Sequence, residues 1–529
     1  MRIISLNRRI VESTGIVMGT MLLSRMLGFF REWTVAHLIG SNGLTDAYYA
    51  AFTLPDFLNY LVAGGALGII FIPVFTEYLA ENREEEGWHV FSTVMTFMAL
   101  VLILLVALGE IFAPQLVRVI APGFDAAQKS RVISLTRLML PAQFFLYLGS
   151  VMGAVQNANT RFLIPALATV VYNVGIISGG WLLASRLGVI GFAVGLLAGA
   201  FVGFFILQAA AVWRMGARFT PNLDFNHPGF RMFVKLAIPI MLALSFVITD
   251  QWIIRWFGSY LAPASITWLT YSKILMQMPL AIVVQSAGIA SFPFLAKLYA
   301  EGKFEELNRT LNSTLKGLML ILVPISALLA VLSRPFIYLV FSHTRLHAGD
   351  FEATAAALVL FSMGLCFWGI QHMVSRGFYA AQDTLTPAWV GTALTFVNLP
   401  VYWYCAQRWH YLGLAAASSI GAASMALVLS ILLVRRTRNR QAGELAIFLM
   451  RITAASALAA VVCHQITGWL ELRVGWHSVG GALVILVSVT AIGLPLMALL
   501  AKLFGVTEIN AYWRKLLLWM PKRVAVVAD

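Results

Sequence analysis

Long apolar stretches, separated by short charged or turn-rich breaks, run along the whole chain of 529 residues. Each is long enough to cross the hydrocarbon of a bilayer as a helix, which takes about 20 residues. A transmembrane β-barrel would instead alternate polar and apolar positions over segments of about ten residues. The pattern therefore predicts an all-α polytopic membrane protein with about fourteen transmembrane helices, at about 10–39, 45–79, 88–109, 132–156, 163–184, 189–213, 232–257, 264–296, 310–332, 353–381, 386–405, 412–434, 446–470 and 478–503.

An internal repeat relates the first six spans to the next six. Seven residues recur after 220 and then 222 positions: Gly68, Pro73, Ala80, Glu81, Pro165, Gly191 and Gly199, repeated as Gly288, Pro293, Ala300, Glu301, Pro387, Gly413 and Gly421. Because six spans separate the copies, the copies share one orientation, as in transporters that alternate access around a site between two parallel repeats. We predict an N-terminal lobe at 1–220, a C-terminal lobe at 221–440, and a third part at 441–529 with spans 13 and 14 and an amphipathic cytoplasmic tail.

Lysine and arginine gather on one side of this topology. That side holds the basic run at 435–440 and both ends of the chain, whereas loops such as 340–350 hold far fewer. The positive-inside rule therefore predicts that both termini face the cytoplasm and that 340–350 faces outward. The first apolar stretch continues past Leu38 without a small-residue cleavage site, so we expect it to remain as a span.

The composition supports a membrane protein and argues against other classes. Hydrophobic residues make up 60% of the chain and charged residues 11%, whereas soluble domains hold about 25% charged residues. The formal charge of +14 is explained by basic loops that face anionic lipid, so we expect membrane lipids and no nucleic acid as partners.

The sequence carries no signature of an enzyme. It has no GxxxxGK[ST] loop for nucleotide phosphates, no HExxH pair, and no recognisable set of nucleophile, base and acid. Cys366, Cys405 and Cys463 stand alone in apolar segments, without the paired spacing of a metal site. We predict a protein that is not an enzyme and binds no cofactor or structural metal.

Ionisable residues inside the spans cost about 3 kcal/mol each at mid-bilayer and usually face a cavity or a partner. Arg25, Arg31, Arg255 and Lys273 fall in the leading pair of helices of each predicted lobe. Four cations around a cavity favour an anionic substrate, because arginine binds phosphate with a bidentate fork and lysine as a point charge. The alternative is structural: Arg31 pairs with Glu32 or Asp46, Arg255 pairs with Asp250, and the others extend to an interface.

Three polar side chains in or beside the spans are candidates for coupling transport to Na⁺ or H⁺. Asp250, Asp383 and Asn398 supply the hard oxygen atoms that such cations prefer. For Asp383 the favoured alternative is helix capping, because Asp383 and Thr384 directly precede the span at 386–405 and are a good helix start signal.

Six segments resemble successive signature segments of one transporter family, the MurJ (MviN) lipid II flippases of the multidrug/oligosaccharidyl-lipid/polysaccharide exporter superfamily. They are LSRMLGFFRE at 23–32, TDAYYAAFTLPDFLNYLVAGGAL at 45–67, FIPVFTEY at 71–78, IAPGF at 120–124, NTRFLIPA at 159–166 and RGFYAAQDTLTPA at 376–388. The resemblance covers roughly residues 10–435.

The resemblance implies a fourteen-span fold with two six-span lobes in the bacterial cytoplasmic (inner) membrane. It also implies export of the undecaprenyl-pyrophosphate-linked peptidoglycan precursor, lipid II, with other cell-wall synthesis proteins as partners. The family's functional arginines match Arg25 and Arg31, and its acidic position in span 2 matches Asp46; Glu32 stands where the family usually has Asp.

Two segments depart from the family pattern and keep other functions open. Asn59, Tyr60 and Gly64 stand where the family commonly has Arg, Arg and Glu, and Lys273 and Ile274 stand where it has Asp and Arg. A flippase for another polyprenyl-linked glycan, such as an exopolysaccharide or O-antigen unit, would fit these changes. A cation-coupled multidrug exporter, expected to have a less cationic cavity, and a non-transporting scaffold are the further alternatives.

Overall fold

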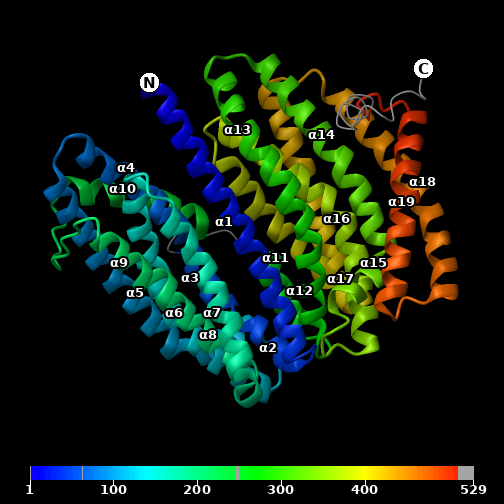
Figure 1. The fold of residues 1–529 in the computed structure, drawn as a ribbon, viewed down its shortest axis with the longest axis horizontal. Helices are drawn as coiled ribbons and strands as arrows, with labels where there is room; N and C mark the ends of the chain where they lie inside the picture. Colours follow the sequence, from blue (N-terminus) through cyan, green and yellow to red (C-terminus); the bar gives the residue numbers. More distant parts are fainter. Residues whose placement is uncertain (1, 62–63, 246–249, 510–529) are drawn as a thin grey trace. The chain divides into compact units, whose positions relative to one another are not determined.

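The computed structural model describes residues 2–61, 64–245 and 250–509, and these fold into helices joined by turns and loops (Figure 1). The helices are α1 (Arg2–Leu38), α2 (Gly43–Ala51), α3 (Thr53–Leu61), α4 (Gly64–Ala80), α5 (Glu84–Ile120), α6 (Ala126–Ala158), α7 (Leu163–Leu187), α8 (Val189–Ala200), the π-helix η1 (Phe201–Ile206), α9 (Leu207–Trp213), α10 (Pro228–Ser245), α11 (Asp250–Gly258), α12 (Ser265–Pro279), the π-helix η2 (Leu280–Val284), α13 (Gln285–Ala300), α14 (Phe304–Val331), α15 (Ser333–Phe341), α16 (Ala348–Ala380), α17 (Leu385–Thr437), α18 (Ala442–Val474) and α19 (Val479–Leu503). The predicted amphipathic tail lies largely beyond residue 509, outside the described residues.

The all-α membrane fold predicted from the sequence is confirmed. In the described part of the chain, 10 helices are long and apolar enough to cross a membrane. The predicted spans at 386–405 and 412–434 lie together in α17. The predicted spans at 10–39, 45–79 and 232–257 correspond to α1, to α2–α4 and to α10–α11, which are not among these 10 helices.

The repeat is visible in the backbone, because residues with left-handed φ recur at the offsets seen in the sequence. Gly188 (φ 57°, ψ −134°) separates α7 from α8, and His410 (φ 49°, ψ −129°), 222 residues later, divides α17 into two helices in the same way. Three further pairs share this feature: Asn82 with Gly302, Thr160 with Gln382, and Gly216 with Arg438. The two copies therefore turn at equivalent positions even where the residue type differs.

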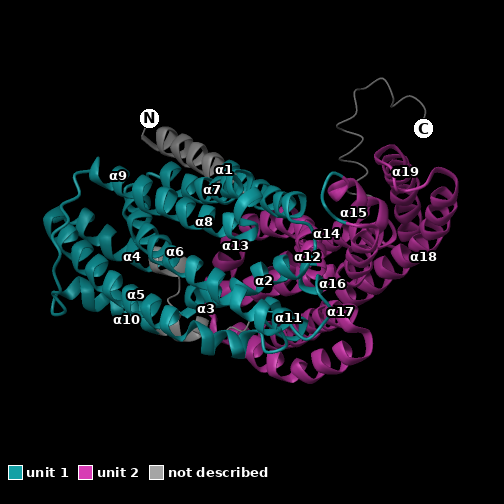
Figure 2. Ribbon diagram, turned by 90° about the horizontal axis from the view of Figure 1, so that it is seen from below, with its two compact units in different colours: residues 1–267, 343–346 teal, residues 268–342, 347–529 magenta. Residues whose placement is uncertain are grey.

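The chain packs into two compact units, residues 1–267 with 343–346 and residues 268–342 with 347–529 (Figure 2). The first, unit 1, includes α10 and α11, because Phe233 of α10 packs against Phe71 of α4 with ring centroids 6.2 Å apart. The lobe boundaries after residues 220 and 440 rest on the repeat, which compactness does not test, and they stay predictions.

The core of unit 1 lies among α4, α5, α6 and α10. Phe71, Val94 and Val151 are fully buried there, and Phe233 is almost so. Beside this core, α7 and α8 approach closely, since a Cβ on Gly179 would lie 2.4 Å from the Cα of Gly195. α1 also packs against α7, so it lies next to the closely packed pair of α7 and α8.

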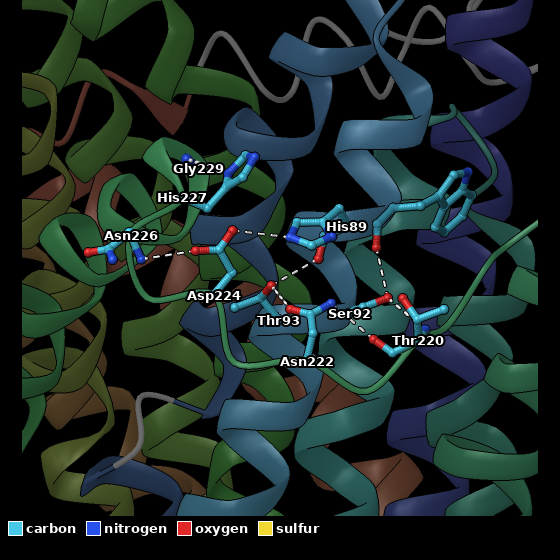
Figure 3. A network of polar contacts seen from close by, with 10 residues as sticks. His89, Ser92, Thr93, Thr220, Asn222, Asp224, Asn226, His227 and Gly229 are labelled. Atoms are coloured by element: carbon cyan, nitrogen blue, oxygen red, sulfur yellow. Dashed lines mark hydrogen bonds and ion pairs between the residues drawn. The ribbon is translucent and has the colours of Figure 1, made fainter.

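The connection between α9 and α10 is held against the start of α5 by polar contacts (Figure 3). His89 Nε2 lies 3.3 Å from Asp224 Oδ2, and the Thr93 hydroxyl donates to Asn222. The Thr220 amide donates to Ser92 Oγ at 3.2 Å. The hydrogen bond from His89 holds the pKa of the Asp224 carboxyl below its usual range.

The second compact unit, unit 2, is built around α16. This helix packs on α13, α14, α15 and α17 through a buried stripe that includes Leu358, Phe361 and Leu365, each fully buried. The last two helices form a pair, with α18 also contacting α14 and α19 contacting α15. Spans 13 and 14 are therefore part of the same packed body as the preceding helices.

Candidate functional site

A buried acidic and aromatic cluster fixes Arg31 at the end of α1. Arg31 donates through Nε and Nη2 to Glu32 Oε1 at 2.9 and 2.5 Å. The Tyr49 hydroxyl of α2 donates to Glu32 Oε2 at 2.6 Å, and Glu32 is only 4% exposed. Glu32 thus orients the guanidinium, and of the two structural partners considered for Arg31, the described contact is with Glu32.

Asp46 is held by the backbone and hydroxyl of Thr267. Its Oδ1 accepts from the Thr267 amide at 2.8 Å and from the Thr267 hydroxyl at 2.6 Å, and the residue is 2% exposed. α2 itself begins with a capping box in which the Asn42 side chain accepts from the first turn and Thr45 bonds back to the Asn42 amide. This cap sets the start of α2 and so the direction in which Asp46 leaves the helix.

Arg25 lies two turns before Arg31 on α1 and is exposed. Ser24 beside it contacts Asn173 of α7, with Oγ and Nδ2 3.4 Å apart. One turn later, a Cβ on Gly28 would meet no heavy atom within 4 Å. This stretch of α1 therefore presents the exposed Arg25 cation, with open space beside Gly28 on the same helix face.

Arg255 pairs with an acidic residue that the sequence analysis did not single out. Its Nη1 donates to Asp56 Oδ2 of α3 at 2.9 Å and lies 3.4 Å from Thr53 Oγ1. Asp56 lies within the segment LPDFLNYL of the second predicted span, so its position there was visible in the sequence. Asp250, the partner considered earlier, begins α11 and is half-buried.

Lys273 of α12 is packed among aromatic rings in unit 2. It is 4% exposed, and its Nζ lies 5.4 Å from the ring centre of Trp368 and 5.9 Å from that of Phe361. A desolvated ammonium over aromatic faces is stabilised by about 2 kcal/mol. The Phe361 and Trp368 rings of α16 therefore stabilise the buried Lys273 ammonium.

Asp383 is a helix-capping residue in the geometry. Its Oδ1 accepts from the Thr386 amide at 2.9 Å, its Oδ2 accepts from the Thr386 hydroxyl at 2.7 Å, and Arg436 forms an ion pair with the same oxygen. Burial by itself raises the pKa of the Asp383 carboxyl. The hydrogen bonds from Thr386 and the Arg436 cation outweigh burial and hold that pKa below its usual range. Asn398 donates to Ser424 Oγ at 3.1 Å across the two halves of α17.

The structure thus groups the candidate residues by unit. Arg25, Arg31, Asp46, Asp250 and Arg255 belong to unit 1, and Lys273, Asp383 and Asn398 to unit 2. Within the described ranges, no group of three or more His, Cys, Asp or Glu side chains is arranged to hold a metal ion.

Comparison with known proteins places this arrangement among transporters. The family described as "MurJ: Lipid II flippase MurJ" matches residues 35–506. A protein of Buchnera aphidicola named probable lipid II flippase MurJ is 28% identical over 85% of this chain and 89% of its own length. The lipid II flippase MurJ of Burkholderia cenocepacia is 25% identical over 87% of this chain and 90% of its own length.

Solved structures agree on the fold. A structure described as lipid II flippase MurJ in an inward closed conformation has a TM-score of 0.75 at 22% identity and covers 93% of this chain and 99% of its own. An inward-facing multidrug resistance MATE transporter of the MOP superfamily has a TM-score of 0.64 at 14% identity, over 78% of this chain and 94% of its own. The family match over residues 35–506 confirms the family resemblance drawn from the sequence.

Proposed function

Because this chain belongs to the MurJ family of lipid II flippases, we propose that it carries lipid II from the inner to the outer leaflet of the cytoplasmic membrane by alternating access. The family match over residues 35–506 carries this proposal. The chain is a multi-pass membrane protein of this family; the cytoplasmic placement of both termini is the part of the proposal that rests on its lysine and arginine distribution.

Arg25 and Arg31 are proposed to bind the pyrophosphate. Arg25 is exposed beside the open face at Gly28, so a head group can reach its guanidinium. Arg31 is pre-oriented by Glu32, and a pyrophosphate would share or replace that carboxylate as the acceptor. Both residues use the planar fork that suits phosphate oxygens.

Asp46, Arg255 and Lys273 are proposed to bind or release the substrate as the transporter changes state. Arg255 is neutralised by Asp56 and Lys273 is held under aromatic rings. An anionic head group would attract either cation only after these contacts are exchanged. This exchange gives a means of making the cations available in one state and not in another.

For coupling, we propose that a cation acts at Asp250 rather than at Asp383. Both Asp383 oxygens already accept hydrogen bonds from Thr386, and Arg436 supplies a cation. Asp250 sits in a predicted span, where a carboxylate is costly to keep. Asn398, bonded to Ser424, is a polar link between the two halves of α17.

A flippase for another polyprenyl-linked glycan is the second candidate, and one cluster favours it. The ring centres of Tyr60 and Phe57 of α3 lie 5.5 and 5.9 Å from that of Trp252, and Tyr60 stands where the family commonly has an arginine. Aromatic faces suit sugar rings rather than phosphates. The change therefore shifts recognition in this region from the pyrophosphate toward the saccharide.

Complementation separates the two candidates. Expression of this chain in a bacterium depleted of its own lipid II flippase should restore growth and the appearance of lipid II in the outer leaflet. Failure at full membrane abundance, combined with restored export of a different polyprenyl-linked glycan in a matching mutant, would favour the second candidate and refute the first.

Arg25 provides the residue-level test. Arg25→Ala should abolish flipping without loss of folded protein, and Arg25→Lys should keep only part of it, because lysine keeps the charge and lacks the fork. Arg186→Ala, at an exposed arginine near the end of α7, is the matched control. Normal transport by Arg25→Ala at wild-type abundance would remove Arg25 from the substrate site.

A further inference from the structure

Two turns at equivalent places in the repeat, one between α6 and α7 and one between α16 and α17, share their backbone conformation. The residue after the left-handed position donates a matching backbone hydrogen bond in each. Arg161 N donates to Gln156 O at 2.8 Å, and Asp383 N donates to Phe378 O at 3.0 Å. Donors and acceptors are each 222 residues apart, so the two turns can be compared position by position.

The comparison exposes an inversion of charge. In unit 2, Asp383 of the turn pairs with Arg436 in the last turn of α17. The equivalent positions in unit 1, 222 residues earlier, are Arg161 and Arg214. One copy thus closes the gap between turn and helix end with an ion pair, whereas the other places two cations there.

Arg161 and Arg214 line a cavity of about 520 Å³ in unit 1. No lining residue is acidic. Within the described part of the chain, neither guanidinium has an ion pair or a side-chain hydrogen bond. The remaining lining is mostly apolar and includes Phe162, Leu207 and Met215. Two arginines facing one cavity repel each other unless an anion lies between them, so the cavity is matched to a negative ligand.

We propose that this cavity binds the phosphate of an anionic phospholipid from the surrounding leaflet. The phosphate takes the place that the Asp383 carboxylate has in the other copy and accepts from Arg161 and Arg214. Bidentate arginine contacts to phosphate are among the strong charge-assisted hydrogen bonds. None of the residues lining the cavity belongs to α1.

Three observations favour a lipid over a soluble anion. The apolar lining suits glycerol and the upper acyl chain. Trp213, directly before Arg214, is 80% exposed, as expected for a residue at a membrane interface. The lysine and arginine distribution predicts that Arg161 and Arg214 lie on the cytoplasmic side, where leaflets carry anionic lipids.

Native mass spectrometry of the purified full-length protein tests the proposal. Protein would be titrated with phosphatidylglycerol, with phosphatidylcholine of the same chains, and with soluble glycerol 1-phosphate. Wild-type protein should retain phosphatidylglycerol preferentially. Arg161→Asp, which recreates the ion pair of the other copy, and Arg214→Gln should each lower that retention about tenfold.

Arg435→Asp is the matched control, because Arg435 is exposed at the end of α17 and does not line the cavity. It should leave phosphatidylglycerol retention unchanged. Wild-type retention by both Arg161→Asp and Arg214→Gln would overturn the site, as would equal retention of phosphatidylcholine. Equally strong binding of glycerol 1-phosphate would overturn the lipid assignment. None of these readouts depends on flipping, so they stand apart from the test of the proposed function.

Discussion

The turn before α7 and the turn before α17 follow one backbone path and carry opposite electrostatics. Thr160 and Gln382 both adopt left-handed φ, at 58° and 56°. The following side chain is a cation in the first copy and an anion in the second, facing an arginine in both. At the second turn the ion pair between Asp383 and Arg436 balances the charge, whereas two arginines line a cavity at the first.

This difference shows which features the duplicated architecture restrains. Backbone turns recur because the helices that they join must pack in the same direction in each copy, and only a few dihedral combinations permit that reversal. Side chains at the helix ends lie near solvent or lipid head groups and are not bound by that packing. Charge can therefore change in one copy while the fold stays the same.

The largest effect is expected when the second turn is changed to resemble the first. Asp383→Arg removes the cap on Thr386 and places two arginines together, so it should destabilise unit 2 by about 2 kcal/mol. The drop in unfolding temperature in detergent measures this. The double variant Asp383→Arg with Arg436→Asp restores an ion pair and should recover part of the loss; no recovery would show that Arg436 contributes nothing.

A second test uses the paired turns at Gly188 and His410, which share φ near 50° and ψ near −130°. Gly188→Ala introduces a Cβ at this strained conformation and should cost about 1–2 kcal/mol, although no atom lies within 4 Å of that Cβ. Gly443→Ala, at a helical glycine with equally open surroundings, is the control and should be neutral or stabilising. An unchanged unfolding temperature for Gly188→Ala would show that the turn relaxes freely.

The reverse exchange should have a smaller effect. His410→Gly relieves backbone strain at an exposed position, but glycine also gains conformational freedom in the unfolded chain. The net stabilisation should be about 1 kcal/mol or less. Thermal unfolding of His410→Gly beside His410→Ala separates backbone strain from loss of the imidazole. A less stable His410→Gly would mean that side-chain contacts outweigh strain there.

The smallest expected effect concerns the connections that follow α9 and α17. The first is held by the titratable pair His89 and Asp224, whereas its counterpart uses neutral Asn312 and Asn439, 3.1 Å apart. The depressed pKa of Asp224 means that its contribution is present above the ordinary carboxyl pKa of about 4 and is lost as pH falls through the lower folded value.

Asp224→Asn should therefore slightly flatten the dependence of unfolding temperature on pH in the acid range, and Asn439→Ala should leave that slope unchanged. Hydrogen exchange of residues 217–227 gives a local measurement of the same effect. Identical acid slopes in wild type and Asp224→Asn would mean that the carboxylate is not stabilised by His89 in solution.

Several features could be predicted from the sequence because their causes are local or periodic. The apolar stretches indicated the helices, and equal offsets between glycines and prolines indicated the repeat that recurs in the turns. Asp383 and Thr384 before an apolar run identified the start of α17, and the structure has Asp383 bonded to Thr386. The family resemblance rested on six segments between residues 23 and 388, and the family match over residues 35–506 agrees with it.

Only the tertiary structure decided which charges meet. Arg255 contacts Asp56, 199 residues away along the chain. Lys273 lies under Trp368, and Arg161 shares a cavity with Arg214. Hydrophobic length and turn propensity are properties of a short segment, so they can be read along the chain. Ion pairs and cavities depend on how distant helices are rotated and packed, because the cost of an intramembrane charge is met by whichever group that packing brings within reach.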